Sequence, residues 1–293
     1  MAWRPDVINS GENERTFFMR QNYRFQILAP PQTPTSPTFG DSEINEQLYY
    51  QSLTSMQRLR GRVYLKDGAI QPWELDEDGR FRMRGDEESW HILLRDSDEK
   101  TIGCARYLVH PNTVALEDLR ICQSSLARHP AWAERVRQAM EIDLQRAREH
   151  HLSYVEIGGW ALCEEWRGTS AALEILVASY ALAHLWGGCL AACTATVRHH
   201  SSSILRRIGG VSFEIGGEKL PPYEDKHYGC TMELLRFDSR SPAERFIPLI
   251  NRLRIKIANT PMIRRVGAPF WAKRASEAAL GENLLLRMAP VYN

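Results

Sequence analysis

The chain has 293 residues, of which 43% are hydrophobic, and its formal net charge at neutral pH is +1. This length fits one ordinary domain with extensions or two small domains, and the apolar fraction is enough for a sizeable core. The small charge provides no overall attraction to nucleic acid. No uncharged run approaches the roughly 20 residues of a membrane span, and the N-terminal residues lack the apolar stretch of a signal peptide. We therefore expect a cytoplasmic protein that does not bind nucleic acid.

The first region in chain order is 1–42, which we interpret as a leader or linker that is partly irregular. Its end, APPQTPTSPTFGD, contains closely spaced prolines that disfavour both helix and sheet. Aromatic residues earlier in this region could still anchor it across the surface of the protein: Phe17, Phe18, Tyr23 and Phe25.

The second region, 43–237, has the periodicities of a folded domain. Apolar residues at helical spacing predict one or two helices before a glycine at 68, and a polar turn at 97–100 joins two apolar runs as a hairpin. An amphipathic pattern with proline in its first turn predicts a further helix over 130–150. The run YGCTMELLRF at 228–237 predicts a last strand.

The most informative segment lies between residues 154 and 213. A strand with a Gly-Gly pair (154–162) leads through an Arg-Gly-Thr-Ser turn into an apolar helix (173–186) whose only charged residue is Glu174. A second apolar strand (189–197) and a short helix ending at glycine follow. The first N–H groups of a helix have no intrahelical partner and attract an anion. This arrangement therefore favours binding of a carrier that bears a phosphate.

The third region, 238–293, is predicted to be a basic helical C-terminal extension. Residues 241–274 carry eight lysines and arginines against one acid, Glu244. Two interpretations stay open: a helix packed on the core with its basic face in water, or a surface that contacts an acidic protein or an anionic membrane.

The six cysteines lie mostly within apolar runs, and none is part of a CxxC pair. We expect reduced, buried thiols rather than disulfides or zinc ligands. The histidines also lack metal-like spacing, so no metal is predicted.

This order of elements resembles the GNAT superfamily of acyltransferases. The resemblance implies an α/β (α+β) fold: a mixed, mostly antiparallel central sheet with two splayed strands, flanked by helices. In that family an Arg/Gln-x-x-Gly-x-Gly/Ala loop holds the carrier's phosphate. Here the loop corresponds to Arg167, Gly168, Thr169, Ser170, Ala171 and Ala172, with serine where glycine is usual, and Leu162 precedes it.

Within the superfamily, the chain is most similar to acyl-homoserine-lactone synthases and long-chain N-acyl amino acid synthases. An Arg-x-x-Val/Ile-aromatic signature is matched by Arg60, Val63 and Tyr64, and a Gly-x-x-Arg strand by Gly103 and Arg106. This resemblance implies that acyl carrier protein or acyl-CoA donates the acyl group, with no metal.

Several positions of the lactone synthase pattern differ. The pattern has a Glu-x-x-Arg motif, of which Glu156 is present and Gly159 stands in place of the arginine. The pattern also has a pair of aspartates, of which Asp86 is present and Met83 stands in place of the other. At the position where the pattern has a tryptophan after the first signature, this chain has Ile70. Because the missing residues help to hold S-adenosylmethionine in lactone synthases, the resemblance favours an N-acyl amino acid synthase.

Acyl transfer to an amine needs a neutral amine, a stabilised oxyanion, and a donor and acceptor held in line. We predict that Glu156 accepts the amine's proton; the alternative is a solvated or arginine-paired glutamate. An N–H group of Gly159, Trp160 or Ala161 could bond the thioester oxygen.

The substrate-binding candidates are Arg60, Tyr64, Asp86 and Arg106. The two arginines could bind an acceptor carboxylate, and structural ion pairs with Asp86 or Glu156 are the alternative. The predicted activity is transfer of an acyl group, long-chain by the resemblance, to an amino acid or related amine. The competing hypotheses are an acetyl-CoA-dependent N-acetyltransferase and a degenerate module that binds or regulates. The predicted partners are acyl carrier protein and, through the basic tail, a peripheral membrane surface.

Overall fold

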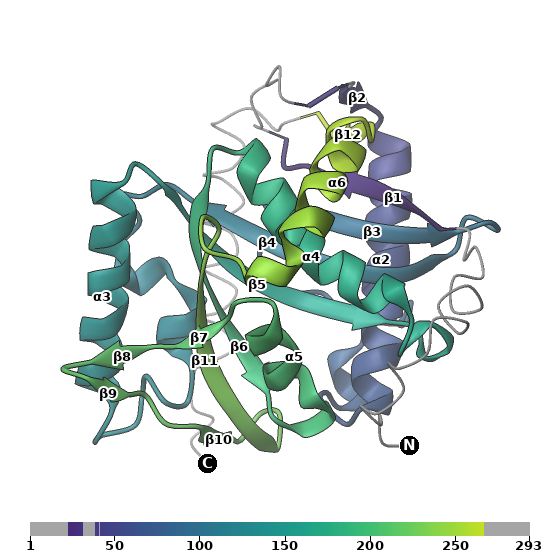
Figure 1. Ribbon diagram of the computed structural model, residues 1–293. Coiled ribbons are helices and arrows are strands. Elements are labelled where there is room, and N and C mark those ends of the chain that lie inside the picture. Colours follow the sequence, from purple (N-terminus) through teal and green to yellow (C-terminus); the bar gives the residue numbers. More distant parts are fainter. Residues whose placement is uncertain (1–22, 32–38, 41, 267–293) are drawn as a thin grey trace, which may run out of the picture.

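A computed structural model describes residues 23–31, 39–40 and 42–266. Its centre is a ten-stranded sheet in the order β10-β11-β6-β5-β4-β3-β1-β12-β2, with β7 paired to β11 (Figure 1). The strands are β1 Tyr23–Leu28, β2 Ser42–Ile44, β3 Trp90–Asp96, β4 Thr101–His110, β5 Ser153–Leu162, β6 Cys189–Thr196, β7 Val211–Ser212, β10 Tyr223–Asp225, β11 Cys230–Asp238 and β12 Met262–Arg264. A separate ribbon pairs β8 Glu214–Ile215 with β9 Glu218–Lys219.

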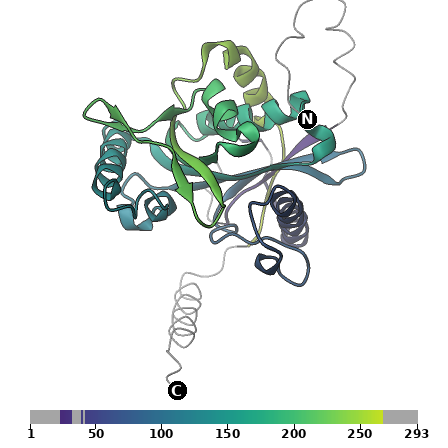
Figure 2. The same cartoon turned by 90° about the horizontal axis from the view of Figure 1, so that it is seen from below.

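Helices cover both faces of the sheet. The helices are α2 Glu46–Lys66, α3 Ala133–Glu149, α4 Ser170–Leu185, α5 Ser201–Arg207 and α6 Ile247–Ala258. The short 3-10 helices are η1 Pro72–Glu74, η2 Leu116–Asp118, η3 Arg120–Gln123, η4 Glu164–Trp166, η5 Arg198–His200 and η6 Glu244–Phe246. Figure 2 shows α2 and α3 on one face and α4, α5 and α6 on the other. Most neighbouring strands are antiparallel, and β5–β6, β1–β12 and β12–β2 are parallel. The fold class predicted from the sequence is confirmed.

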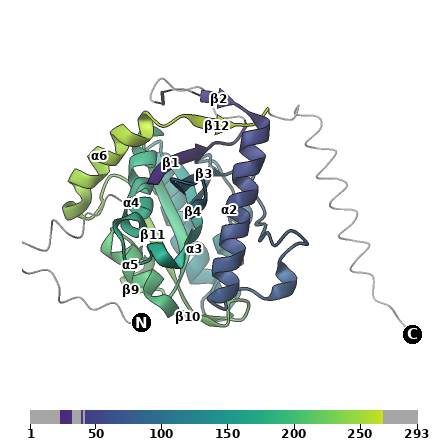
Figure 3. The same ribbon diagram turned by 90° about the vertical axis from the view of Figure 1, so that its right-hand side faces the viewer.

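The apolar helix predicted over 173–186 corresponds to α4, and its composition follows from its position. Its inner side packs on the sheet through buried residues such as Ile175 and Ala183. Its outer side is covered by α6, whose buried residues are Ile250, Leu253 and Ile257 (Figure 3). A helix that is apolar on all sides is stable only when it is enclosed in this way. Of the two interpretations of the basic tail, packing on the core therefore holds for α6.

The sheet extends beyond both boundaries expected from the sequence. Strand β1 comes from the region interpreted as a leader, and its residues Ile27 and Leu28 are fully buried. It pairs with β3 on one side and with β12, from the C-terminal region, on the other. The proline-rich composition before residue 42 and the basic composition after residue 238 therefore do not mark the edges of the folded core. Phe17, Phe18 and the residues after 266 lie outside the described chain.

The predicted helix over 130–150 begins three residues later, at Ala133. The N–H groups of Trp132 and Ala133 both bond to the carbonyl of His129, so a tight turn precedes the first helical residue. Pro130 belongs to this turn. Helix ends commonly differ by a few residues from a sequence pattern because such turns share its composition.

Candidate active site at the splayed strands

Strands β5 and β6 run side by side for only part of their length. They pair in parallel from Ser153 with Cys189 to Glu156 with Ala192, and the ladder ends there. Beyond this point β5 continues along β4 as far as Leu162, and β6 continues along β11 as far as Thr196. We call the separated segments, 157–162 of β5 and 193–196 of β6, the splay. The parting of the strands predicted from the sequence is confirmed (Figure 1).

A β-bulge lies in the β5 half of the splay. The β4–β5 register shifts between Cys104, which pairs with Ala161, and Arg106, which pairs with Gly158. Gly159 has φ +62°, a left-handed conformation that side chains disfavour. A Cβ atom there would lie 3.1 Å from Arg106 Cβ and 3.2 Å from Arg60 Nη1. Glycine is therefore required at this position, as the Gly-Gly pair suggested.

The two neighbouring glycines should respond differently to substitution. Gly159→Ala is expected to cost about 1–3 kcal/mol, because it combines a strained φ with close contacts. Gly158→Ala is the matched control, since a Cβ at Gly158 meets nothing within 4 Å and φ there is not positive. Thermal denaturation of both variants measures the difference. Equal losses of stability would contradict the role of the bulge.

Glu156 is the last residue of β5 to pair with β6, so it lies where the splay opens. Its side chain is buried, and both carboxylate oxygens are held. Oε1 accepts a hydrogen bond from the Ile121 N–H (2.9 Å), and Oε2 lies 3.0 Å from His110 Nε2. The carboxylate is therefore neither in bulk water nor paired with an arginine.

Open space lies beside Glu156 on the α2 and α3 face of the sheet. Residues two apart on a strand share a face, so Glu156 and Gly158 point the same way. Gly158 has no side chain and nothing within 4 Å of its Cβ position. Across the splay, Thr194 of β6 is exposed. A small acceptor could therefore approach the carboxylate from this face.

Arg60 and Asp86 form a buried ion pair below the bulge. Arg60 is fully buried and donates to both Asp86 oxygens, with distances of 3.1 Å and 2.6 Å, and to the Phe81 carbonyl. Gln57 and the Met83 N–H also donate to Asp86. Burial alone would raise the pKa of Asp86, but the Arg60 guanidinium outweighs it and lowers this pKa to about 2. These two residues follow the alternative, structural reading: they bind each other, and the prediction that Arg60 binds an acceptor carboxylate is not supported.

His91, a neighbour of Asp86, and Tyr64, a predicted site residue, complete this cluster. His91 Nε2 lies 2.7 Å from the Asp86 carbonyl oxygen, and complete burial lowers the pKa of His91 to about 4. Tyr64 is half-buried, and its ring packs against Phe81 at a centroid distance of 5.8 Å. Burial raises the pKa of Tyr64, so the hydroxyl stays protonated.

Arg106 has fewer compensating contacts than Arg60. It is buried, donates to the Arg84 carbonyl (2.9 Å) and lies 3.6 Å from Asp86. Arg120, which no sequence motif indicated, donates to the same carbonyl at 2.9 Å. Burial and the nearby Arg120 lower the pKa of Arg106 to about 10. Because Arg106 pairs with Gly158, both guanidinium groups lie near the open space, and this side of the site has an excess of positive charge.

The predicted phosphate loop lies at the open end of the splay, between the end of β5 and the start of α4. Gly168 has φ +81°, and Thr169 caps α4 by accepting from the Ala171 N–H (3.3 Å). Helix α4 starts at Ser170, so Ala171 and Ala172 are in its first turn. Arg167 is partly exposed and pairs with Asp67 at 2.9 Å. The loop is thus a helix N-terminus beside an arginine.

The remaining predicted residues lie along the separated edge of β5. Ala161 and Leu162 are buried and pair with Cys104 and Gly103 of β4. Trp160 follows the bulge, and its buried Nε1 has no hydrogen-bond partner within the described chain. The structure therefore gathers the residues from Glu156 to Ala172 around the splay.

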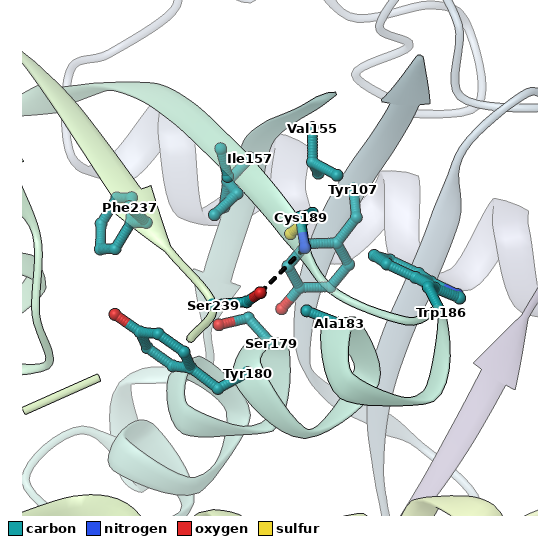
Figure 4. Close-up of a pocket in the computed structure, with 11 residues that line it drawn as sticks. Tyr107, Val155, Ile157, Ser179, Tyr180, Ala183, Trp186, Cys189, Phe237 and Ser239 are labelled. Carbon is teal, nitrogen blue, oxygen red and sulfur yellow. Dashed lines mark hydrogen bonds between the residues drawn. The ribbon is translucent and has the colours of Figure 1, made fainter. Parts of the chain in front are cut away.

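A small apolar cavity of about 20 Å³ lies on the α4 face at the base of the splay (Figure 4). Val155 and Ile157 of β5 and Cys189 of β6 form one wall, and α4 forms the other. The lining residues are Tyr107, Val155, Ile157, Ser179, Tyr180, Ala183, Trp186, Cys189, Ala191, Phe237 and Ser239. This volume holds about one water molecule.

Two features are absent from the described residues. No group of three or more His, Cys, Asp or Glu side chains is placed to hold a metal ion. No helix among these residues is long and apolar enough to cross a membrane.

Solved structures of several acyltransferases resemble this chain at low sequence identity. No protein-family model matches the sequence, and no curated protein matches it. FeeM, an N-acyl amino acid synthase from uncultured soil microbes, has 10% identity and a TM-score of 0.47, covering 75% of this chain and 92% of its own. BjaI, a CoA-dependent acyl-homoserine lactone synthase, has 14% identity and a TM-score of 0.49, covering 88% and 100%. A putative N-acetyltransferase from Lactobacillus plantarum has 12% identity and a TM-score of 0.41, covering 74% and 98%. At these identities the likeness is one of fold.

Proposed function

We propose that the protein is an N-acyltransferase that moves an acyl group from a phosphopantetheine thioester to the amine of an amino acid or related small molecule. The single observation that supports this most is the end of the β5–β6 ladder at Glu156. It leaves the edges of two strands without ladder partners beside a buried carboxylate, and a helix N-terminus lies at the open end.

The carrier arm would lie in the splay. Its phosphate would meet the first turn of α4 and Arg167, and its amide groups would bond the free edge of β5. The thioester carbonyl would then reach the N–H groups after the bulge, at Gly159, Trp160 or Ala161. Hydrogen bonds aimed at this oxygen stabilise the tetrahedral intermediate that forms during acyl transfer.

The acceptor amine would approach from the open space at Gly158. The nitrogen of the neutral amine attacks the carbonyl carbon, Glu156 accepts its proton, and the C–S bond breaks. The same proton then passes to the thiolate sulfur, which leaves as a thiol, and Glu156 is ionised again. His110 and the Ile121 N–H hold Glu156 in position for this step. Arg106 and Arg120 would bind a carboxylate of the acceptor, since guanidinium groups pair with carboxylates through two hydrogen bonds.

The cavity at the base of the splay is where the tail of the acyl group would enter. At about 20 Å³ it accommodates only a few atoms. A long chain would need Trp186 and Phe237 to move away, although each buried methylene would contribute ~0.8 kcal/mol. The donor could be acyl carrier protein or acyl-CoA, because the phosphate and pantetheine are common to both.

The test is a product assay with purified protein. Acyl-CoA and acyl carrier protein thioesters from acetyl to palmitoyl are combined with a panel of amino acids and amines. Thiol release and mass spectrometry of amides measure the reaction. Amides of amino acids support the proposal, and acetyl transfer to other amines alone supports the acetyltransferase hypothesis. Thioester binding without thiol release supports a degenerate binding module.

A further inference from the structure

The last turn of α2 crosses the open end of the splay. Lys66 forms an ion pair with Glu164, which follows β5. Asp67 pairs with Arg167, also on the β5 side. The Gly68 carbonyl accepts a hydrogen bond from Arg198 Nη2 at 3.1 Å, and Arg198 follows β6. Three consecutive residues therefore contact both sides of the opening.

The Asp67–Arg167 contact is bidentate. Arg167 Nη2 lies 2.9 Å from Asp67 Oδ2, and Nη1 lies 3.3 Å from Oδ1. Asp67 is the more buried partner, with 22% of its side chain exposed against 40% for Arg167. Phosphate binds arginine through the same pair of N–H groups as a carboxylate. Asp67 thus occupies the donors of Arg167 that a phosphate would use.

We propose that Asp67 competes with the phosphopantetheine phosphate for Arg167. This inference rests on the proposed function, because it assumes that the arm enters at Arg167. When the phosphate binds, Asp67 leaves the guanidinium and one of the contacts across the opening is lost. Asp67 therefore lowers the affinity for the carrier.

The effect on affinity should be modest, because exposed ion pairs contribute little to stability. Asp67→Asn is expected to tighten binding of CoA about twofold to fivefold at low salt, and less as the salt concentration rises. The asparagine removes the competing charge and its repulsion of the phosphate. In the Arg167→Ala background the same change should give a smaller gain, because the shared guanidinium is absent and only the relief of repulsion remains.

Calorimetric titration measures these affinities in wild type, both single variants and the double variant. CoA and a holo acyl carrier protein are titrated separately. The ligand whose affinity rises identifies the source of the phosphate, and a rise for either ligand supports the proposal. Glu134→Gln is the matched control, because Glu134 forms a comparable bidentate pair with Arg137 on α3. Its affinity should equal that of wild type.

Unchanged or weaker binding by the Asp67→Asn variant would overturn the inference, because Asp67 would then orient Arg167 rather than compete for it. An equal gain in the absence of Arg167 would overturn it as well. Failure of the proposed function looks different: wild type would bind neither CoA nor the holo carrier protein. Thermal denaturation checks that each variant is folded.

Discussion

Replacing Glu156 by glutamine is expected to lower kcat by about a hundredfold to ten-thousandfold, the usual contribution of a general base. The amide cannot accept the proton of the attacking amine. Its oxygen can still accept from the Ile121 N–H, and its NH₂ group can donate to His110, so the variant should fold. Steady-state rates of thiol release, with amide confirmed by mass spectrometry, measure the loss.

The control for this variant is Glu233→Gln. Glu233 is also a strand glutamate with specific partners, Ser202 and Arg206, but it lies on β11 and contacts α5. Its activity should stay within a few-fold of wild type. If Glu156→Gln retained the wild-type rate, Glu156 would be a structural residue that only joins β5 to His110 and the loop at Ile121.

The largest expected effect on stability comes from breaking the buried pair below the bulge. Arg60→Met removes both Arg60 hydrogen bonds to the buried Asp86 carboxylate and leaves it the longer contact to Arg106, at 3.6 Å. Breaking a buried ion pair typically costs about 3–5 kcal/mol. For a domain of this size the melting temperature should fall by roughly 6–20 °C. Removing both charges, in Arg60→Met combined with Asp86→Leu, should recover most of the loss, because a buried pair contributes little net stability.

Arg58→Met is the matched control for this prediction, since Arg58 lies on the same helix and its partner Asp78 is about half exposed. It should cost no more than about 1 kcal/mol. Differential scanning calorimetry of the three variants and wild type measures these values. Equal losses at Arg58 and Arg60 would show that the buried pair has no special role.

The cost of Arg60→Met should also depend on pH. In wild type the pKa of Asp86 is held at about 2, below the ordinary value of 3.8, so the pair stabilises the fold above pH ~4 and this contribution is lost as pH falls towards 2. The difference between wild type and variant should therefore shrink on acidification. The pKa of His91 is lowered from 6.5 to about 4 in the folded protein. As pH falls below ~6.5 the unfolded chain therefore binds a proton at His91 that the folded protein does not, and both proteins lose stability.

The sequence predicted best those helices and strands that are long and whose neighbours are uniformly apolar. The β5–α4–β6 unit could be predicted because its apolar runs are continuous and its glycines lie at the bulge and the turn. Strands β1 and β12 could not, because β12 has three residues and β1 is followed closely by prolines. Their pairing depends on segments from opposite ends of the chain.

The candidate site shows the same limit. Glu156 and the loop after Arg167 were found because they flank a recognisable strand and helix. His110, Ile121 and Arg120 were not, since no spacing relates them to Glu156 and they lie on a strand end and a short 3-10 helix. Arg60 and Asp86 matched a motif, yet only the structure shows that they satisfy each other at complete burial.

The pairing of β1 with β12 has a consequence for how the protein folds during synthesis. Ile27 leaves the ribosome early, but its parallel partner, Met262, is among the last described residues to be made. Until then one edge of β1 exposes unpaired N–H and C=O groups beside apolar side chains. Such an edge invites aggregation, and contacts between distant residues form slowly. Nascent chains that stop before Met262 should therefore need a chaperone that shields β1.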